Sequence, residues 1–81
     1  MDDKSHATKL TEREEQLLYL VSNEMSNAEI AKRLFLSKNT IDSHKKNLFL
    51  KLGVSNSAGL IRRAFELDLL PMEKPASLEE L

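Results

Sequence analysis

Apolar residues recur every three or four positions along most of this chain, which is the spacing of an amphipathic helix. Four segments show the pattern, and polar residues separate them. The residues that carry it are Leu17, Leu18 and Val21; Ile30, Ala31 and Leu34; Ile41, Leu48 and Leu52; and Leu60, Ile61, Ala64 and Phe65. No stretch reads convincingly as a strand. The pattern therefore predicts an all-α domain whose single core receives side chains from four helices.

Residues able to cap a helix stand before the first three segments. Thr11 with Glu14, and Ser26 with Glu29, fit the capping box, in which a hydroxyl accepts from a backbone amide and a carboxylate accepts from the amide of the cap. Ser37 is a third candidate cap. We therefore predict helices over Glu12–Asn23, from Ser26 through Leu34, and over Lys38–Leu52.

The later boundaries rest on residues that stop helices. Gly53 can adopt the positive φ that commonly ends a helix. Ser55, Asn56 or Ser57 can cap the fourth helix, and Pro71 ends the apolar pattern. This predicts a bundle-like, four-helix domain over residues 10–70 built around a helix-turn-helix. Residues 1–9 are expected to be a flexible tail or linker remnant, and 71–81 a disordered acidic tail in which SLEEL could form a partial helical turn.

Length and composition exclude several classes of function. A chain of 81 residues buries only about 60% of its unfolded surface, which leaves little room for a large catalytic cleft. The absence of cysteine and the presence of only two histidines argue against a metal site. No nucleophile has an adjacent base, and there is no glycine-rich phosphate loop, so we expect neither an enzyme nor a cofactor. The lack of a long apolar run and the acidic start predict a cytoplasmic protein without a membrane segment.

Charge is unevenly distributed along the chain. The formal net charge of −1 does not by itself favour binding to nucleic acid. Between Lys32 and Arg63, however, eight basic residues accompany one acid, Asp42. The basic residues are Lys32, Arg33, Lys38, Lys45, Lys46, Lys51, Arg62 and Arg63. This segregation predicts a positive face, with an ordinary solvated surface as the alternative.

The helix predicted over 38–52 has two different sides. A helical wheel places Ile41, Leu48 and Leu52 on one side and polar residues on the other, mostly in the first three turns. A helix with small polar, amide and cationic side chains in its first half suits the major groove of DNA. The candidate DNA-binding residues on this helix are Lys38, Asn39, Thr40, Asp42, Ser43, Lys46 and Asn47.

The starts of the second and third helices are candidate phosphate sites. Free amides and the positive end of the helix dipole bind anions there, and polar side chains are added by Ser26, Asn27, Ser37 and Thr40. The alternative is that Ser26 and Ser37 act only as caps.

Asp42 also has two interpretations. Its carboxylate could accept a hydrogen bond from cytosine N4, or it could pair with Lys45 or Lys46 and hold that lysine in place.

The chain from Leu10 to Leu70 resembles the LuxR/FixJ-type helix-turn-helix domain, the output module of many bacterial response regulators and quorum-type regulators. The matching stretches are LTEREEQLL, SNAEIAKRLFLS, NTIDSH, KNLFLKLGV and the ending from Ala64 to Leu70. The resemblance implies sequence-specific binding of double-stranded DNA by the output domain of a transcriptional regulator, in particular a two-component response regulator. The helix over 38–52 would be the recognition helix. The chain would then be either an excised output domain or a stand-alone regulator.

The resemblance also implies a two-fold dimer through the fourth helix. The candidate residues are Leu60, Ile61, Ala64 and Phe65, although the same residues could serve the core. The alternative function is a helical protein-interaction module that contacts RNA polymerase or a receiver domain through Leu50 and the fourth helix.

The sequence departs from the family pattern at three positions. Glu24 stands where a glycine often ends the first helix, so either the loop adopts another geometry or Asn23 supplies the left-handed residue. Asp42 and Ser57 replace a frequent lysine and a frequent arginine, which favours a changed DNA sequence preference with DNA binding retained.

Overall fold

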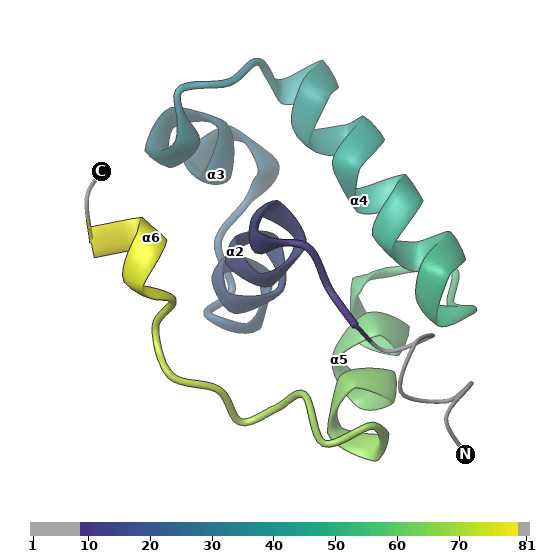
Figure 1. Cartoon of the computed structure of the whole chain (residues 1–81). Coiled ribbons are helices and arrows are strands. Elements are labelled where there is room, and N and C mark those ends of the chain that lie inside the picture. The colour runs from purple at the N-terminus through teal and green to yellow at the C-terminus, as the bar shows by residue number, and fades with distance from the viewer. Residues whose placement is uncertain (1–8, 80–81) are drawn as a thin grey trace.

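The computed structural model describes residues 9–79, and every regular element in this range is an α-helix. The helices are α2 (Glu12–Ser22), α3 (Asn27–Leu34), α4 (Lys38–Leu52), α5 (Ser57–Glu66) and the short α6 (Ala76–Glu79) (Figure 1). This confirms the predicted all-α class and the bounds predicted for the helix over 38–52, which is α4. The tail expected over residues 1–9 lies, except for Lys9, outside the described residues. None of the described helices is long and apolar enough to cross a membrane.

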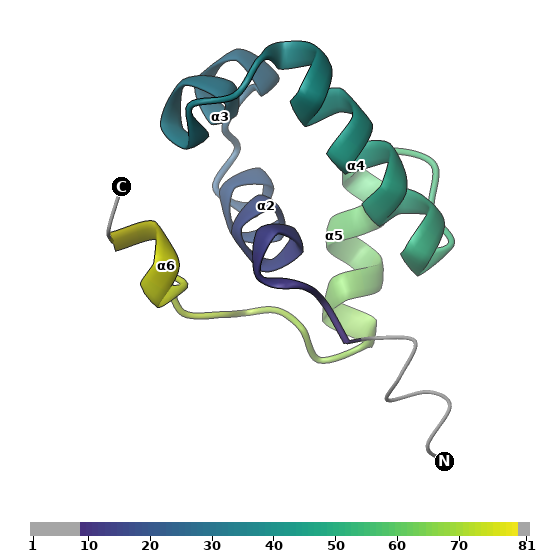
Figure 2. The ribbon, with the colours of Figure 1, turned by 45° about the horizontal axis from the view of Figure 1, so that its top comes forward.

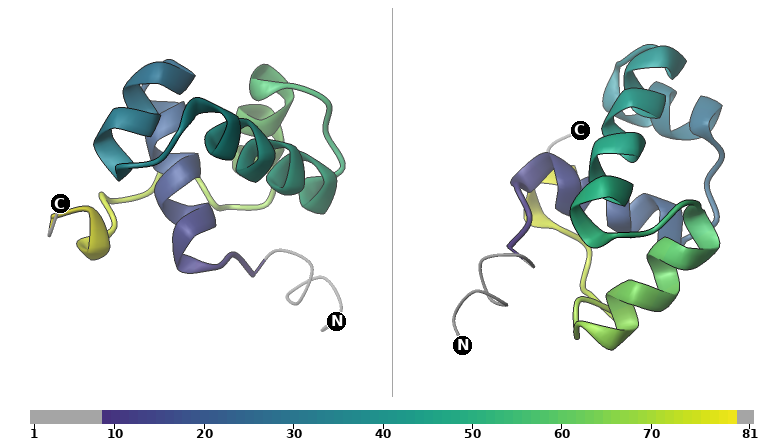
Figure 3. Two further views of the ribbon diagram at one scale, coloured as in Figure 1. Left: turned by 90° about the horizontal axis from the view of Figure 1, so that it is seen from above. Right: turned by 90° about the vertical axis from the view of Figure 1, so that its right-hand side faces the viewer.

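Helix α2 lies at the centre of the domain. It contacts α4, α5 and α6, while α3 packs mainly against α4. The views in Figures 2 and 3 show α3 beside the start of α4 and α5 beside its end. The start of α4 therefore packs against α3 and its end against α5, and α2 also contacts α4.

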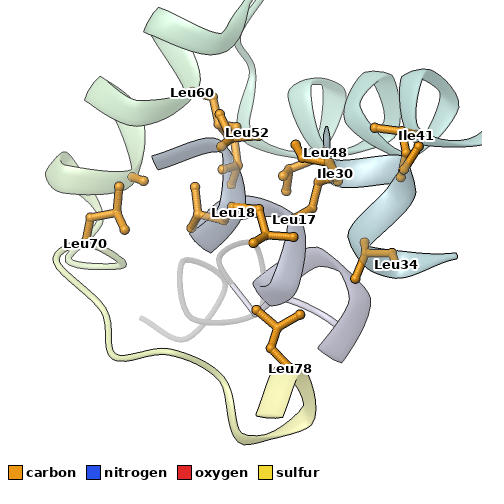
Figure 4. Packing of buried hydrophobic residues seen from close by; sticks show 14 residues of the cluster. Leu17, Leu18, Ile30, Leu34, Ile41, Leu48, Leu52, Leu60, Leu70 and Leu78 are labelled. Carbon is orange, nitrogen blue, oxygen red and sulfur yellow. The ribbon is translucent and has the colours of Figure 1, made fainter. Parts of the chain in front are cut away.

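The core is built from branched aliphatic side chains of all five helices. Figure 4 shows these side chains converging on Leu17 and Leu18 of α2. The largest fully buried residues are Leu17, Leu18, Ile30, Ile41, Leu48, Leu60 and Leu78. Each such side chain contributes about 1.5 to 3 kcal/mol when it leaves water, so burial of the apolar faces stabilises the arrangement.

The predicted caps are present. Thr11 Oγ1 accepts from the Glu14 amide at 3.1 Å, and Glu14 Oε1 accepts from the Thr11 amide at 2.9 Å. Ser26 and Glu29 form the equivalent pair at 3.1 and 2.8 Å. Of the three candidates for the cap of α5, the structure selects Asn56, whose Oδ1 accepts from the Gly59 amide at 2.8 Å.

Residues with positive φ lie in all four connections between the described helices, at Glu24, Phe35, Gly53 and Asp68. Gly53 has φ 71°, as predicted for the end of α4. In the turn after α2 the left-handed residue is Glu24 itself, with φ 64°, whereas Asn23 has φ −98°, so of the two alternatives the one that relied on Asn23 is wrong. Phe35, which ends α3 with φ 59°, was not predicted at all. Because a bulky side chain rarely adopts this region, no local pattern predicts it at Phe35.

The expectation of a disordered tail is wrong for residues 71–79, which we call the C-terminal strap, whereas the partial helical turn expected within SLEEL is present in α6. Leu78 is completely buried. Gln16 Nε2 donates to Ser77 Oγ at 2.8 Å, and Arg33 Nη2 donates to the Leu78 carbonyl at 3.1 Å. The strap has too few apolar residues for a core of its own, but it adds one leucine to the core that the other helices form.

An ion pair joins the C-terminal end of α4 to α2. Lys51 Nζ lies 2.8 Å from Glu14 Oε1, and both side chains are mostly shielded from solvent. Burial alone would raise the pKa of Glu14, but the hydrogen bonds from Lys51 and Thr11, together with the Lys51 charge, hold it below its usual value. A carboxylate with a lowered pKa stabilises the fold above its unfolded pKa, and the contribution disappears as pH falls through the folded pKa.

Replacing the buried leucine of the strap tests whether the strap belongs to the fold. Leu78→Ala should lower the free energy of unfolding by about 2 kcal/mol, near the low end for such changes because the strap can detach locally. Urea denaturation followed by circular dichroism measures the loss. Glu79→Ala, at an exposed neighbouring position, is the control, and its free energy of unfolding should stay close to that of the parent. If the two variants are equally stable, the strap contributes nothing to the stability of the fold.

Removing the ion pair between Lys51 and Glu14 should lower the free energy of unfolding by an amount that depends on pH. Lys51→Met is expected to lower the free energy of unfolding at pH 7 by at most about 1 kcal/mol, because solvent partly screens the pair. The difference from the parent should shrink below pH 4.5, the usual pKa of the carboxyl group, as Glu14 becomes protonated. Urea titrations at pH 7 and pH 3 provide the measurement, with exposed Lys74→Met as the control. A difference that is the same at both pH values would contradict the role given to Glu14.

Candidate nucleic-acid interface

Helix α4 presents one side to the core and the other to solvent. Ile41 and Leu48 are completely buried, and Leu52 is nearly so. Asn39 and Ser43, on the opposite side of the helix, are both exposed. The buried stripe therefore fixes which side chains face outward, as the helical wheel predicted.

Most of the predicted DNA-binding residues lie on α4, outside its buried stripe. Those on α4 that are exposed to solvent are Lys38, Asn39, Asp42, Ser43, Lys46 and Asn47, and Thr40 is half-buried. We call these seven residues the reading face. It combines amide, hydroxyl and ammonium groups, which can donate to base edges or phosphates, with the carboxylate of Asp42, which can only accept. Within the described residues, no group of histidine, aspartate and glutamate side chains could hold a metal ion.

Asp42 pairs with Lys46, one of the two partners considered for it. The carboxylate Oδ2 lies 3.4 Å from Lys46 Nζ, one helical turn away, and both side chains are largely exposed. An exposed pair of this kind contributes less than about 1 kcal/mol. Lys46 can therefore exchange this partner for a phosphate or a guanine edge at little cost.

The starts of α3 and α4 carry hydroxyl caps with exposed residues around them. Ser26 is exposed, and its hydroxyl accepts from the Glu29 amide. Ser37 Oγ accepts from the Thr40 amide at 3.1 Å and lies 2.9 Å from Thr40 Oγ1. Capping is thus confirmed for both serines. Phosphate binding at these two helix starts stays a prediction.

Asn27 has a structural partner that sequence reasoning missed. Lys45 Nζ, on α4, donates to Asn27 Oδ1, at the start of α3, at 2.8 Å. This bond joins the first turn of α3 to the middle of α4. The signal available in the sequence is the helical wheel, which places Lys45 beside the buried stripe and so indicates a packed side-chain stem without identifying the partner.

The four residues predicted for dimerisation divide into two groups. Leu60 and Ala64 are completely buried within this chain, so they cannot lie on a surface between two copies. Ile61 is half-buried, and Phe65 is 52% exposed. These two line an open pocket of about 360 Å³ whose walls also include Tyr19 and Met72. The exposed apolar surface on α5 is therefore smaller than predicted.

Comparison with protein families places most of the chain in a known group. Residues 8–64 match the family described as bacterial regulatory proteins, luxR family. The matched range includes α2, α3, α4 and most of α5, and it ends before the C-terminal strap.

Individual relatives agree with the family match. Fimbriae Z protein of Salmonella typhimurium is 45% identical over 65 residues, which cover 80% of this chain and 31% of that protein. The transcriptional regulatory protein MctR of Rhizobium johnstonii is 46% identical over 57 residues, covering 70% of this chain and 27% of that one. UhpA of Escherichia coli, also named a transcriptional regulatory protein, is 46% identical over 57 residues, which cover 70% of this chain and 29% of that protein. The chain thus spans less than a third of each of these relatives.

A solved structure has the same helical arrangement. It is the Vibrio cholerae VqmA dimer in the absence of target DNA, described as a LuxR-type receptor. The match has a TM-score of 0.79 and 27% sequence identity, and it covers 86% of this chain and 31% of that one. Fold, family model and relatives agree, and the chain belongs to the luxR family of bacterial regulatory proteins, with the helix-turn-helix of a DNA-binding transcription regulator.

Proposed function

We propose that this chain binds double-stranded DNA in a sequence-specific manner, as the cytoplasmic output domain of a bacterial transcriptional regulator. The observation that supports this most strongly is the reading face, a polar and partly cationic surface on α4 opposite the buried stripe of the same helix. In this proposal α4 enters the major groove, while the starts of α3 and α4 contact phosphates.

The proposal extends to a two-component response regulator. The transcriptional regulatory proteins that this chain resembles are each more than three times as long as the matched region, since that region covers only 27% of MctR and 29% of UhpA. In such proteins the matched domain is one part of a larger regulator. A receiver domain elsewhere in the polypeptide would control this output domain.

We further propose that two copies pair through Ile61 and Phe65 on an inverted-repeat site. Phe65 is an exposed aromatic residue beside a pocket. Arg62 and Arg63 lie next to it and pair with Glu66 at 3.5 and 3.2 Å. An apolar centre within a polar rim is the usual organisation of a protein interface. Contacts of the same surface with RNA polymerase or a receiver domain are the alternative.

The first test measures affinity for a duplex selected from a random pool at several salt concentrations. Lys46→Ala should weaken binding by about 1 to 3 kcal/mol if the ammonium group reads a base. If Lys46 instead neutralises one phosphate, the slope of log affinity against log salt should decrease by about one unit. Lys74→Ala removes the same charge from the exposed strap and should change neither quantity appreciably. Loss of affinity that is equal in both variants, or binding that does not depend on salt, would refute the proposed interface.

The second test concerns pairing on DNA. Phe65→Lys should abolish cooperative binding to a duplex with two half-sites and leave binding to a single half-site unchanged, because it places a charge in the apolar contact. Sedimentation and gel-shift titrations measure this. Phe35→Lys changes another exposed aromatic residue, at the turn between α3 and α4, and serves as the control. Unaltered cooperativity in the Phe65 variant would rule out pairing through α5.

A further inference from the structure

Leu50 is an exposed apolar residue on an otherwise polar side of α4. Its side chain is 79% exposed, more than that of Phe35 or Phe65, the other two exposed large apolar residues. Isolated exposed leucines are common and need no special explanation. The position of Leu50 around the helix, rather than its exposure, connects it to the reading face.

Leu50 continues the line of Asn39, Ser43 and Lys46 along α4. These residues are spaced by four, three and four positions, so Leu50 lies within about 20° of both Asn39 and Ser43 around the helix axis. All four side chains are exposed. Seven residues of helix separate Leu50 from Ser43 by about 10 Å, which corresponds to roughly three base pairs of DNA.

The charged residue next to Leu50 is directed elsewhere. Lys51 Nζ is held by Glu14 Oε1 at 2.8 Å, so its ammonium group points toward α2. One turn earlier, Lys46 Nζ lies 3.4 Å from Asp42. On this side of α4, the last turn therefore presents the apolar side chain of Leu50, whereas the earlier turns present hydrogen-bonding groups.

The surroundings of Leu50 suit DNA better than a protein partner. A protein interface needs a contiguous apolar patch. Phe35 lies at the turn before α4 and Phe65 lies on α5, so neither extends the surface of Leu50 along the reading face. Lys46 and Asn47, one turn or less away, are polar and exposed. A contact with a single methyl group requires no patch.

We propose that Leu50 is a specificity-determining residue that contacts the C5 methyl group of a thymine in the major groove. This methyl group is the apolar feature that distinguishes thymine among the base edges exposed there. The inference rests on the proposed function, because it assumes that the reading face enters the groove. It adds a preference for thymine about three base pairs from the base or phosphate that Ser43 faces.

The test removes the methyl group from the DNA and the leucine from the protein separately. After selection of a preferred duplex with the full chain, each thymine in the site is replaced in turn by deoxyuridine, which lacks only the C5 methyl. At one thymine of each half-site, the replacement should weaken the parent about three- to tenfold. The same replacement should change the affinity of Leu50→Ala by less than about twofold, because the variant has already lost the contact.

Phe35→Ala is the matched control, since it removes another exposed apolar side chain and should keep the sensitivity of the parent. Circular dichroism should show that Leu50→Ala folds normally, because Leu50 contributes nothing to the core. The proposal is overturned if Leu50→Ala keeps the full sensitivity at every thymine, or if the parent is insensitive throughout. Neither result would contradict the proposed binding of DNA by this chain. Failure of the parent to select any duplex would overturn the proposed function as well.

Discussion

The burial of Ile41, Leu48 and Leu52 determines the orientation of α4, and the reading face depends on that orientation. Three apolar side chains at helical spacing can enter the core only if the opposite side of the helix faces solvent. The polar residues on that side then need no further contacts to be presented outward. A single constraint, the removal of one apolar stripe from water, thus separates a structural side of α4 from a binding side.

Polar contacts then position α4 relative to its neighbours. Lys45 joins it to the start of α3 through Asn27, and Lys51 joins its far end to α2 through Glu14. Both lysines belong to the basic stretch of the sequence, yet their ammonium groups face inward partners. Part of the apparent positive charge is therefore structural, which leaves Lys38 and Lys46 as the exposed cations of the reading face. The C-terminal strap completes the opposite side of the domain by placing Leu78 against α2.

The local features of the fold could be predicted from the sequence because nearby residues encode them. The caps at Thr11, Ser26 and Ser37 act over three positions, and the stripe of α4 repeats within one helix. Features that depend on tertiary packing could not be read in this way. The acidic composition around Leu78 favoured disorder, and only the three-dimensional core shows where that leucine fits.

The same distinction applies to the candidate site and to the backbone strain. A wheel can place Lys45 beside the core, but it cannot identify a partner 18 residues away. The apolar pattern of α5 likewise cannot separate residues of the core from residues of its surface, so a dimer contact and a place in the core are both open for Leu60 and Ala64 until the packing is known. Glu24 and Phe35 adopt left-handed conformations that their side chains disfavour, so the packing of the flanking helices overrides the local preference.

The most direct test of the central claim is an NMR titration of the labelled chain with a selected duplex. If the outward side of α4 lies in the groove, the largest amide shifts should occur at residues 38–47 and at Ser26 and Asn27. The C-terminal strap, on the opposite side of the domain, should change little. Shifts confined to α5 or the strap, with residues 38–47 unaffected, would contradict the assignment of α4 as the recognition helix.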